Sequence, residues 1–147
     1  MYERILVCVD ASTVSDRALK EAAKLARGCG ARLRLIHVTD EVNLGLETEQ
    51  AAEEFTRKQL DSGTQVMEHA RQVAREAGVE PETRLAELTA VGKRPAHMIL
   101  EEASQWPADL VVMGTHGRRG LSHLLLGSVA ENVLRHATVP LLLVKDG

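Results

Sequence analysis

Apolar positions along the chain follow two alternating periods, one typical of strands and one typical of helices. The apolar runs at 5–9, 110–113 and 139–144 are typical of parallel strands covered on both faces. Residues 33–38 and the alternating stretch 83–88 suit two further strands. Apolar residues three and four positions apart predict helices near 12–28, 49–77, 96–104 and 128–136. In the longest of these helices, Gly63 marks either a close packing contact or a break.

Strands that alternate with helices predict an α/β fold, because parallel neighbours are joined by helical crossovers. We therefore expect one doubly wound, Rossmann-like domain over residues 1–147. Its five-stranded parallel sheet has the order 3-2-1-4-5, with helices on both faces. Ligands of such folds bind beyond the carboxyl ends of the strands, where the strand order reverses. In this order, that crevice lies between the loops after the first and fourth strands.

The loop after the fourth strand is rich in glycine and leads into a helix. Gly114, Gly117 and Gly120 are followed by Gly127 and Ser128, where the last predicted helix begins. Glycine lets a ligand approach the backbone, and a helix N-terminus offers unpaired N–H groups. An anion there gains about 0.3–1 kcal/mol from the helix dipole. The loop therefore predicts a site for nucleotide phosphates, where Ser128 can cap the helix, bond a phosphate oxygen, or do both.

The loop after the first strand begins Asp10-Ala11-Ser12 and lies on the other side of the expected crevice. Asp10 can bond ribose hydroxyls or hold Mg²⁺, or it can cap the first helix. Other polar candidates have equally simple structural explanations as solvated or helix-terminal residues; they are Arg118, Arg119, His116, His123 and His136.

Composition excludes several classes of partner. The net charge is −3 and the chain has one Trp, one Tyr and one Phe, so it lacks the basic surface and stacking rings of a nucleic-acid-binding protein. No apolar run approaches the roughly 20 residues of a transmembrane helix, and the first residues do not suit a signal peptide. We expect a cytoplasmic protein without a membrane partner. Cys8 lies in a strand pattern, which predicts a buried, inert thiol.

The spacing Gly114-x2-Gly117-x9-Gly127-Ser128 resembles the ATP-binding signature of the universal stress protein family. Val7-Cys8-Val9-Asp10, Ile36-His37-Val38 and the terminal run from Ala137 to Val144 are also similar to that family. The resemblance covers essentially the whole chain apart from about 40–62. It implies the adenine nucleotide alpha hydrolase-like variant of the doubly wound fold and membership of the ATP-binding subgroup.

The resemblance also implies roles for particular residues. Asp10 would lie near the ribose and phosphates, followed by the small residues Ala11 and Ser12, while Val38 would meet the adenine. The loop under the ribose and phosphates would contain Gly114, His116 and Gly117, and the turn that cradles the phosphates would contain Gly127, Ser128 and Val129. Family members often have glycine or proline where this chain has Ala11. We expect this small replacement to be harmless.

The expected function is that of a nucleotide-dependent stress-response protein that binds ATP, ADP or AMP, with Mg²⁺ where the phosphates require it. ATP consumption needs a general base and a cationic clamp. Neither a Gly-x4-Gly-Lys-Ser/Thr loop nor a Ser-Gly-Gly-x-Asp-Ser pattern occurs in the chain. The alternatives are an ATP-consuming enzyme of the related fold with slow hydrolysis, and an interaction subunit without nucleotide.

The apolar run from Val139 to Val144 is expected at the edge of the sheet. Unpaired edges recruit another chain. We therefore expect a homodimer formed through paired fifth strands, and the family resemblance supports this expectation.

Overall fold

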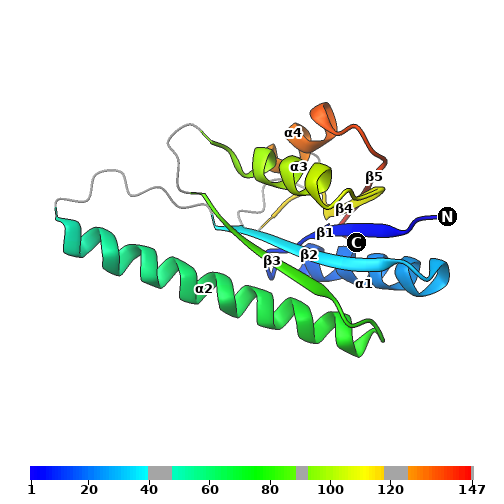
Figure 1. Ribbon diagram of the computed structural model, residues 1–147, viewed down its shortest axis with the longest axis horizontal. Helices are drawn as coiled ribbons and strands as arrows, with labels where there is room; N and C mark the ends of the chain where they lie inside the picture. Colours follow the sequence, from blue (N-terminus) through cyan, green and yellow to red (C-terminus); the bar gives the residue numbers. More distant parts are fainter. Residues whose placement is uncertain (40–47, 89–92, 118–125, 147) are drawn as a thin grey trace.

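A computed structural model describes residues 1–39, 48–88, 93–117 and 126–146 (Figure 1). Strands and helices alternate along these residues, as the two hydrophobic periods predict. The strands are β1 (Arg4–Cys8), β2 (Arg32–Thr39), β3 (Glu82–Glu87), β4 (Leu110–Gly114) and β5 (Leu141–Val144). The helices are α1 (Thr13–Cys29), α2 (Glu49–Glu76), α3 (Pro95–Gln105) and α4 (Ser128–His136).

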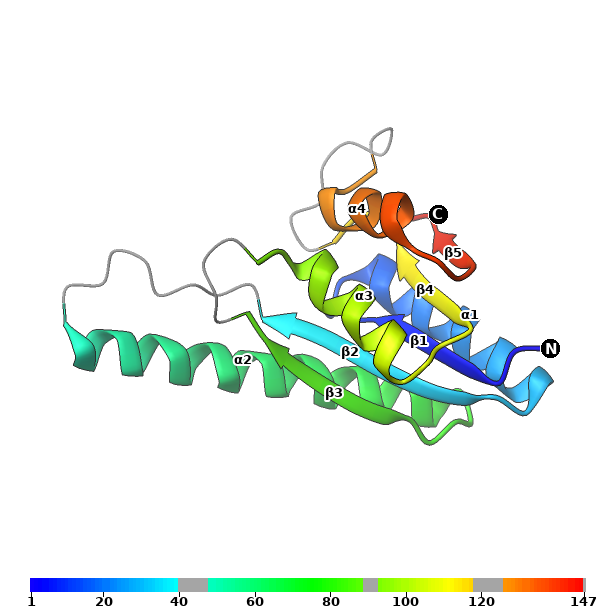
Figure 2. The ribbon, with the colours of Figure 1, turned by 45° about the horizontal axis from the view of Figure 1, so that its top comes forward.

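The strands form one parallel sheet in the order β3-β2-β1-β4-β5, which confirms the predicted topology. Helices α1 and α2 cover one face, and α3 and α4 cover the other (Figures 1 and 2). The chain moves outward from β1 through β2 to β3 and then crosses back to β4. The strand order therefore reverses between β1 and β4, where a parallel sheet leaves a crevice at its carboxyl edge.

The central strand β1 is buried on both faces. Ile5 and Val7 pack with α1 and α2, whereas Leu6 packs with α3 and α4. All three side chains are fully buried. Successive residues of a strand point to opposite faces, so a strand covered on both sides must be apolar at every position. This requirement explains why the sequence of β1 shows no polar alternation.

One detail differs from the sequence prediction, and one alternative that the sequence left open is resolved. The fifth strand begins at Leu141 instead of Val139, because Pro140 has no N–H to give to a ladder, although its carbonyl accepts from the N–H of Val111 at 3.0 Å. The glycine in α2 marks a contact and not a break. A Cβ on Gly63 would lie 3.0 Å from Leu85 Cδ1, which is tighter than an ordinary side-chain contact, so glycine lets the helix pack closely against β3.

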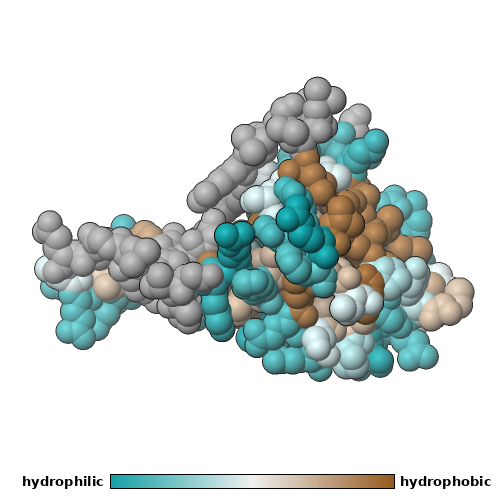
Figure 3. All heavy atoms as spheres, turned by 90° about the horizontal axis from the view of Figure 1, so that it is seen from above, coloured by the Kyte–Doolittle hydropathy of each residue, from teal (hydrophilic) through white to brown (hydrophobic). Residues whose placement is uncertain are grey.

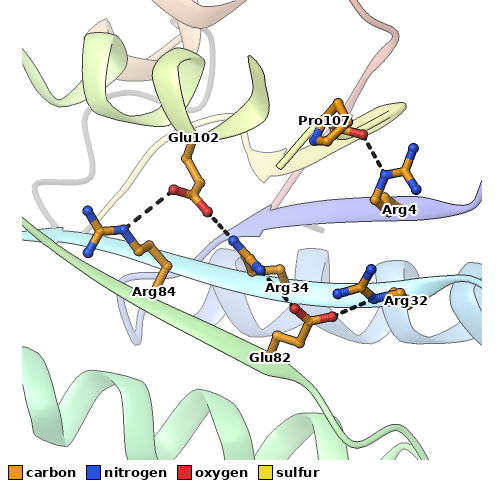
Figure 4. A network of polar contacts seen from close by, with 7 residues as sticks. All are labelled: Arg4, Arg32, Arg34, Glu82, Arg84, Glu102 and Pro107. Carbon is orange, nitrogen blue, oxygen red and sulfur yellow. Dashed lines mark hydrogen bonds and ion pairs between the residues drawn. The ribbon is translucent and has the colours of Figure 1, made fainter. Parts of the chain in front are cut away.

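A network of charged side chains joins β2, β3 and α3 (Figure 4). Arg34 of β2 pairs with Glu82 of β3 at 2.8 Å and with Glu102 of α3, whose side chain is 8% exposed. The Arg34 guanidinium also lies 4.6 Å from the ring centroid of Trp106, within the range of a cation–π contact. On its outer side, Glu82 accepts from Arg32 at 2.7 Å. These pairs fix how α3 lies over the sheet.

Glu82 links the stability of this network to pH. Hydrogen bonds from Arg32 and then Arg34 hold the pKa of this carboxyl below its usual value of 4.5. A pKa lowered in the folded state stabilises the fold above the unfolded pKa, and the contribution disappears as the pH falls through the folded pKa. We expect Glu82→Gln to lower the free energy of unfolding at pH 7, and the loss to shrink below about pH 4.5.

Urea unfolding across this pH range measures the effect, with the exposed Glu53→Gln as the matched control. Wild-type and Glu82→Gln stabilities that differ by the same amount at every pH would contradict the role of Glu82.

Candidate functional site

A cavity of about 780 Å³ opens beyond the carboxyl ends of β1, β2 and β4. Its position is the crevice that the strand order predicts, and its volume suits a small-molecule ligand. The described residues that line it come from the ends of three strands, the start of α4, and α2, α3 and a nearby turn. The end of β1 and the residues after it contribute Cys8, Val9, Asp10 and Ser15, the end of β2 contributes Ile36, His37, Val38 and Thr39, and the end of β4 with the loop after it contributes Met113, Gly114, His116 and Gly117. The start of α4 contributes Gly127, Ser128, Val129 and Ala130, and the remaining residues are Ser62, Gly63, Leu88, Pro95 and Ile99.

The Asp10 carboxylate lies just after the carboxyl end of β1 and is held in place by hydrogen bonds. Its Oδ1 accepts from the backbone N–H of Ser12 at 3.0 Å and from the Ser12 hydroxyl. Ser12 is the N-cap of α1, since its oxygen accepts from the N–H of Ser15 at 3.2 Å. The backbone N–H of Asp10 donates to the hydroxyl of Ser15 at 3.0 Å. Ser12, and not Asp10, is therefore the N-cap of α1, and the hydrogen bonds that Ser12 donates hold the Asp10 carboxylate in position.

The glycine that ends β4 and the next glycine along the chain lie against the β1 loop and α1. A Cβ on Gly117 would lie 2.6 Å from Asp10 Oδ2, and a Cβ on Gly114 would lie 3.0 Å from Val14 Cγ2. The loop can approach Asp10 this closely only because Gly117 has no side chain. The two loops that flank the crevice are thus in direct contact at Asp10.

Helix α4 begins beside this contact. Gly127 is its N-cap, and the N–H of Gly127 donates to the carbonyl of Thr115 at 2.7 Å. A Cβ on Gly127 would lie 3.1 Å from His116 Cα, so the turn is packed against the β4 loop. Ser128 is the first helical residue, not the cap, and it lines the cavity. The first N–H groups of a helix have no intrahelical partners, so this end of the cavity suits an anion.

The structure brings most of the expected site residues together. Those that line the cavity are Asp10, Val38, Gly114, His116, Gly117, Gly127, Ser128 and Val129. Ser12 acts one step away, through its bonds to Asp10. Of the other candidates, His136 lies at the end of α4, away from this cavity, where Nδ1 contacts the Asn132 carbonyl at 3.0 Å. Arg118, Arg119 and His123 lie outside the described residues.

Ala11 is not the neutral replacement that the sequence suggests. It does not line the described cavity, and its φ is +66°. This left-handed conformation brings Cβ close to the backbone and costs an L-residue about 1–2 kcal/mol. Glycine avoids that cost, whereas proline cannot adopt this φ at all. The position therefore stores backbone strain beside Asp10.

Val38 was the one residue predicted at the β2 side of the cavity, and His37 of β2 and the residues of α2 were missed. His37 Nδ1 lies 2.8 Å from the carbonyl of Val9, and because a carbonyl only accepts, Nδ1 carries the proton. A polar residue at the end of an apolar strand was the available signal for His37. Ser62 and Gly63 had no local signal, since only the return of α2 along the sheet brings them to the cavity.

The thiol of Cys8 is partly buried at the wall of the cavity. Burial, and secondarily the charge of Asp10, raises its pKa to about 12. A protonated thiol is neither a nucleophile nor a metal ligand.

Within the described ranges, no three His, Cys, Asp or Glu side chains gather as metal ligands. The helices of those same ranges include none with the length and apolar character needed to cross a bilayer.

Comparison with known proteins decides the family. The model of the universal stress protein family matches residues 1–145. The chain belongs to this family. This universal stress protein is 36% identical over 146 residues to universal stress protein MJ0531 of Methanocaldococcus jannaschii, covering 99% of this chain and 83% of the relative. It is 32% identical over 153 residues to universal stress protein YxiE of Bacillus subtilis, covering 99% of this chain and 100% of the relative.

A solved relative has a nucleotide in its structure. The universal stress protein of Archaeoglobus fulgidus in complex with dAMP is 26% identical to this universal stress protein, with a TM-score of 0.72 and coverage of 98% of each chain. The strand order and flanking helices described above are therefore those of a solved family member.

The strain at Ala11 can be measured directly. We expect Ala11→Gly to raise the free energy of unfolding by about 0.5–1 kcal/mol, because relief of the left-handed strain exceeds the extra entropy of glycine in the unfolded chain. Ala11→Pro should be clearly destabilising, since the pyrrolidine ring fixes φ near −65°. Denaturant titration of both variants checks this pair of signs. A stabilising proline or a destabilising glycine would show that residue 11 is not left-handed in solution.

Proposed function

We propose that this universal stress protein binds ATP, or another adenine nucleotide such as ADP or AMP, in the cavity between the β1 and β4 loops. The contact between Gly117 and Asp10, beside the N-terminus of α4, is the observation that carries the proposal. It puts a fixed carboxylate, which can accept from sugar hydroxyls, next to N–H groups that suit phosphates. The relative from Archaeoglobus fulgidus, solved with dAMP, supports this choice of ligand.

In this proposal, each part of the nucleotide meets a different wall of the cavity. The phosphates lie at the turn of Gly127, Ser128 and Val129, where the dipole of α4 favours negative charge. The ribose lies between Asp10 and the loop from Gly114 through His116 to Gly117. The adenine lies beside Val38, at the end of β2. Mg²⁺ accompanying the phosphates would have the carboxylate of Asp10 as its protein ligand.

The proposed role is to bind the nucleotide without hydrolysing it or transferring its phosphoryl group. Among the described residues that line the cavity there is no Lys or Arg. Phosphoryl transfer relies on cations that stabilise the charge developing on the transferred group. We therefore propose that the stress-response output of the protein depends on whether the nucleotide is bound. We also propose that the protein is a single cytoplasmic domain and that it has no nucleic-acid partner.

We further propose that the protein acts as a homodimer joined through β5. The carbonyl groups of Pro140 and Val144 accept from β4, so the alternate residues Leu141 and Leu143 direct their backbone groups to the open edge. The face that carries α3, α4 and β5 also has a brown, hydrophobic area (Figure 3). Leu134 of α4 is 53% exposed, and every residue of β5 is partly exposed. An open edge beside exposed apolar side chains favours pairing with a second copy.

Nucleotide binding should weaken when the Gly117–Asp10 contact is disturbed. A Cβ at residue 117 must displace the Asp10 carboxylate. Hydrogen bonds to a charged group contribute about 1.5–3 kcal/mol, so we expect Gly117→Ala to weaken ATP binding at least about tenfold. Isothermal titration calorimetry measures the affinity, with Gly28→Ala as control, because a Cβ there meets nothing within 4 Å.

Wild-type protein without measurable affinity for any adenine nucleotide would refute the proposed function. Equal affinities for Gly117→Ala and Gly28→Ala would refute the role of the Asp10 contact.

Dimer formation should depend on the open edge of β5. Proline at 143 removes an N–H that points away from β4, so we expect Leu143→Pro to lower the association constant while the β4–β5 ladder remains. Sedimentation equilibrium measures the association, and circular dichroism checks that the fold is kept. A wild-type protein that is monomeric at micromolar concentration contradicts the dimer proposal.

A further inference from the structure

Helix α2 takes part in the cavity at one point along its length. Ser62 and Gly63 are the residues of α2 that line the described cavity. The helix packs closely on the sheet there, since a Cβ on Gly63 would lie 3.1 Å from Thr39 Cγ2 and 3.6 Å from His37 Cδ2. Thr39 and His37 themselves line the cavity. The backbone of α2 is therefore part of the wall at the β2 side, across β1 from the glycine-rich loop.

The same point divides α2 into two unlike halves. From Gly63 onward the helix buries a continuous apolar stripe that includes Val66, Met67, Ala70 and Ala74. Before Gly63, none of the side chains described between Glu49 and Leu60 is buried. Figures 1 and 2 both show this first half extending past the ends of the strands. The helix has 28 residues, which corresponds to about 42 Å, so the extension is a substantial part of it.

The projecting half has little stability of its own. Helices shorter than about 12–15 residues are marginal in water, and this half is helical chiefly because it continues from the packed half. Glycine is the weakest helix former apart from proline, and Gly63 stands at the junction. Anything that fixes the backbone at the junction therefore increases the order of the preceding turns.

We propose that Ser62 and Gly63 contact the bound nucleotide, and that nucleotide occupancy sets how well ordered the projecting half of α2 is. The inference rests on the proposed adenine-nucleotide function. A base held beside Val38 lies on the same side of β1 as Ser62 and Gly63, and contact with them fixes the junction turn. The coupling is reciprocal, so a partner that orders the projecting half tightens nucleotide binding. A partner that binds the projecting half of α2 can thereby distinguish the nucleotide-bound protein from the empty one.

Amide hydrogen exchange of the wild-type protein, with and without saturating Mg·ATP, tests the proposal. We expect several-fold slower exchange in peptides from 49–60 when ATP is bound, and little change in peptides from 66–76, which are packed in both states. If ATP binds by calorimetry but exchange in 49–60 is unchanged, the inference is overturned while the proposed function stands. If no adenine nucleotide binds, both are overturned.

A pair of variants tests the contact itself. Ser62→Leu enlarges the side chain at the cavity wall with a good helix former, and Thr64→Leu makes the same kind of change at an exposed position of α2. We expect Ser62→Leu to weaken ATP binding about tenfold or more, and each tenfold corresponds to about 1.4 kcal/mol of binding free energy. We also expect it to abolish the ATP-dependent protection of 49–60. Thr64→Leu should keep both. Equal affinities in the two variants would show that Ser62 lies outside the nucleotide site.

Discussion

The burial of β1 on both faces is the constraint on which the rest of the structure depends. Ile5 and Val7 need cover from one side and Leu6 from the other, so helices must lie on both faces of the sheet. Right-handed crossovers meet that need by leaving β1 toward β2 and returning at β4. No helix can then cover the carboxyl ends of β1 and β4, and the cavity is a consequence of how the core is closed.

What this crevice can bind is set by short contacts between its loops. The carboxylate of Asp10 is fixed by the cap of α1 and meets Gly117 at a distance that no side chain allows. The turn at Gly127 is packed against His116, so the first N–H groups of α4 are held beside the same cavity. Ala11, next to Asp10, has a positive φ angle, and the backbone strain of this left-handed conformation is tolerated there. Preorganised polar groups of this kind lose little entropy when a ligand arrives.

Local pattern and family resemblance together predicted the strands, the helices, the sheet order and the position of the glycine-rich loop. The strands, the helices and the loop follow from the periodicity and spacing of neighbouring residues, whereas the sheet order was expected from the doubly wound fold class. The conformation of Ala11 could not be read from its identity, because φ is imposed by the turn between β1 and α1. Ser62 and Gly63 were missed for another reason: they reach the cavity through the packing of α2 on β2 and β3, which no local pattern encodes. Ser128 was expected as a possible cap, yet Gly127 takes that position and leaves Ser128 at the cavity.

We propose above that the cavity holds an adenine nucleotide without consuming it. Denaturing the purified protein and separating the released small molecules by chromatography tests this most directly, before and after incubation with Mg·ATP. We expect an adenine nucleotide in an amount that approaches one per chain, recovered largely as ATP after incubation. Protein that releases no adenine nucleotide under either condition, or that converts the added ATP rapidly to product, would contradict it.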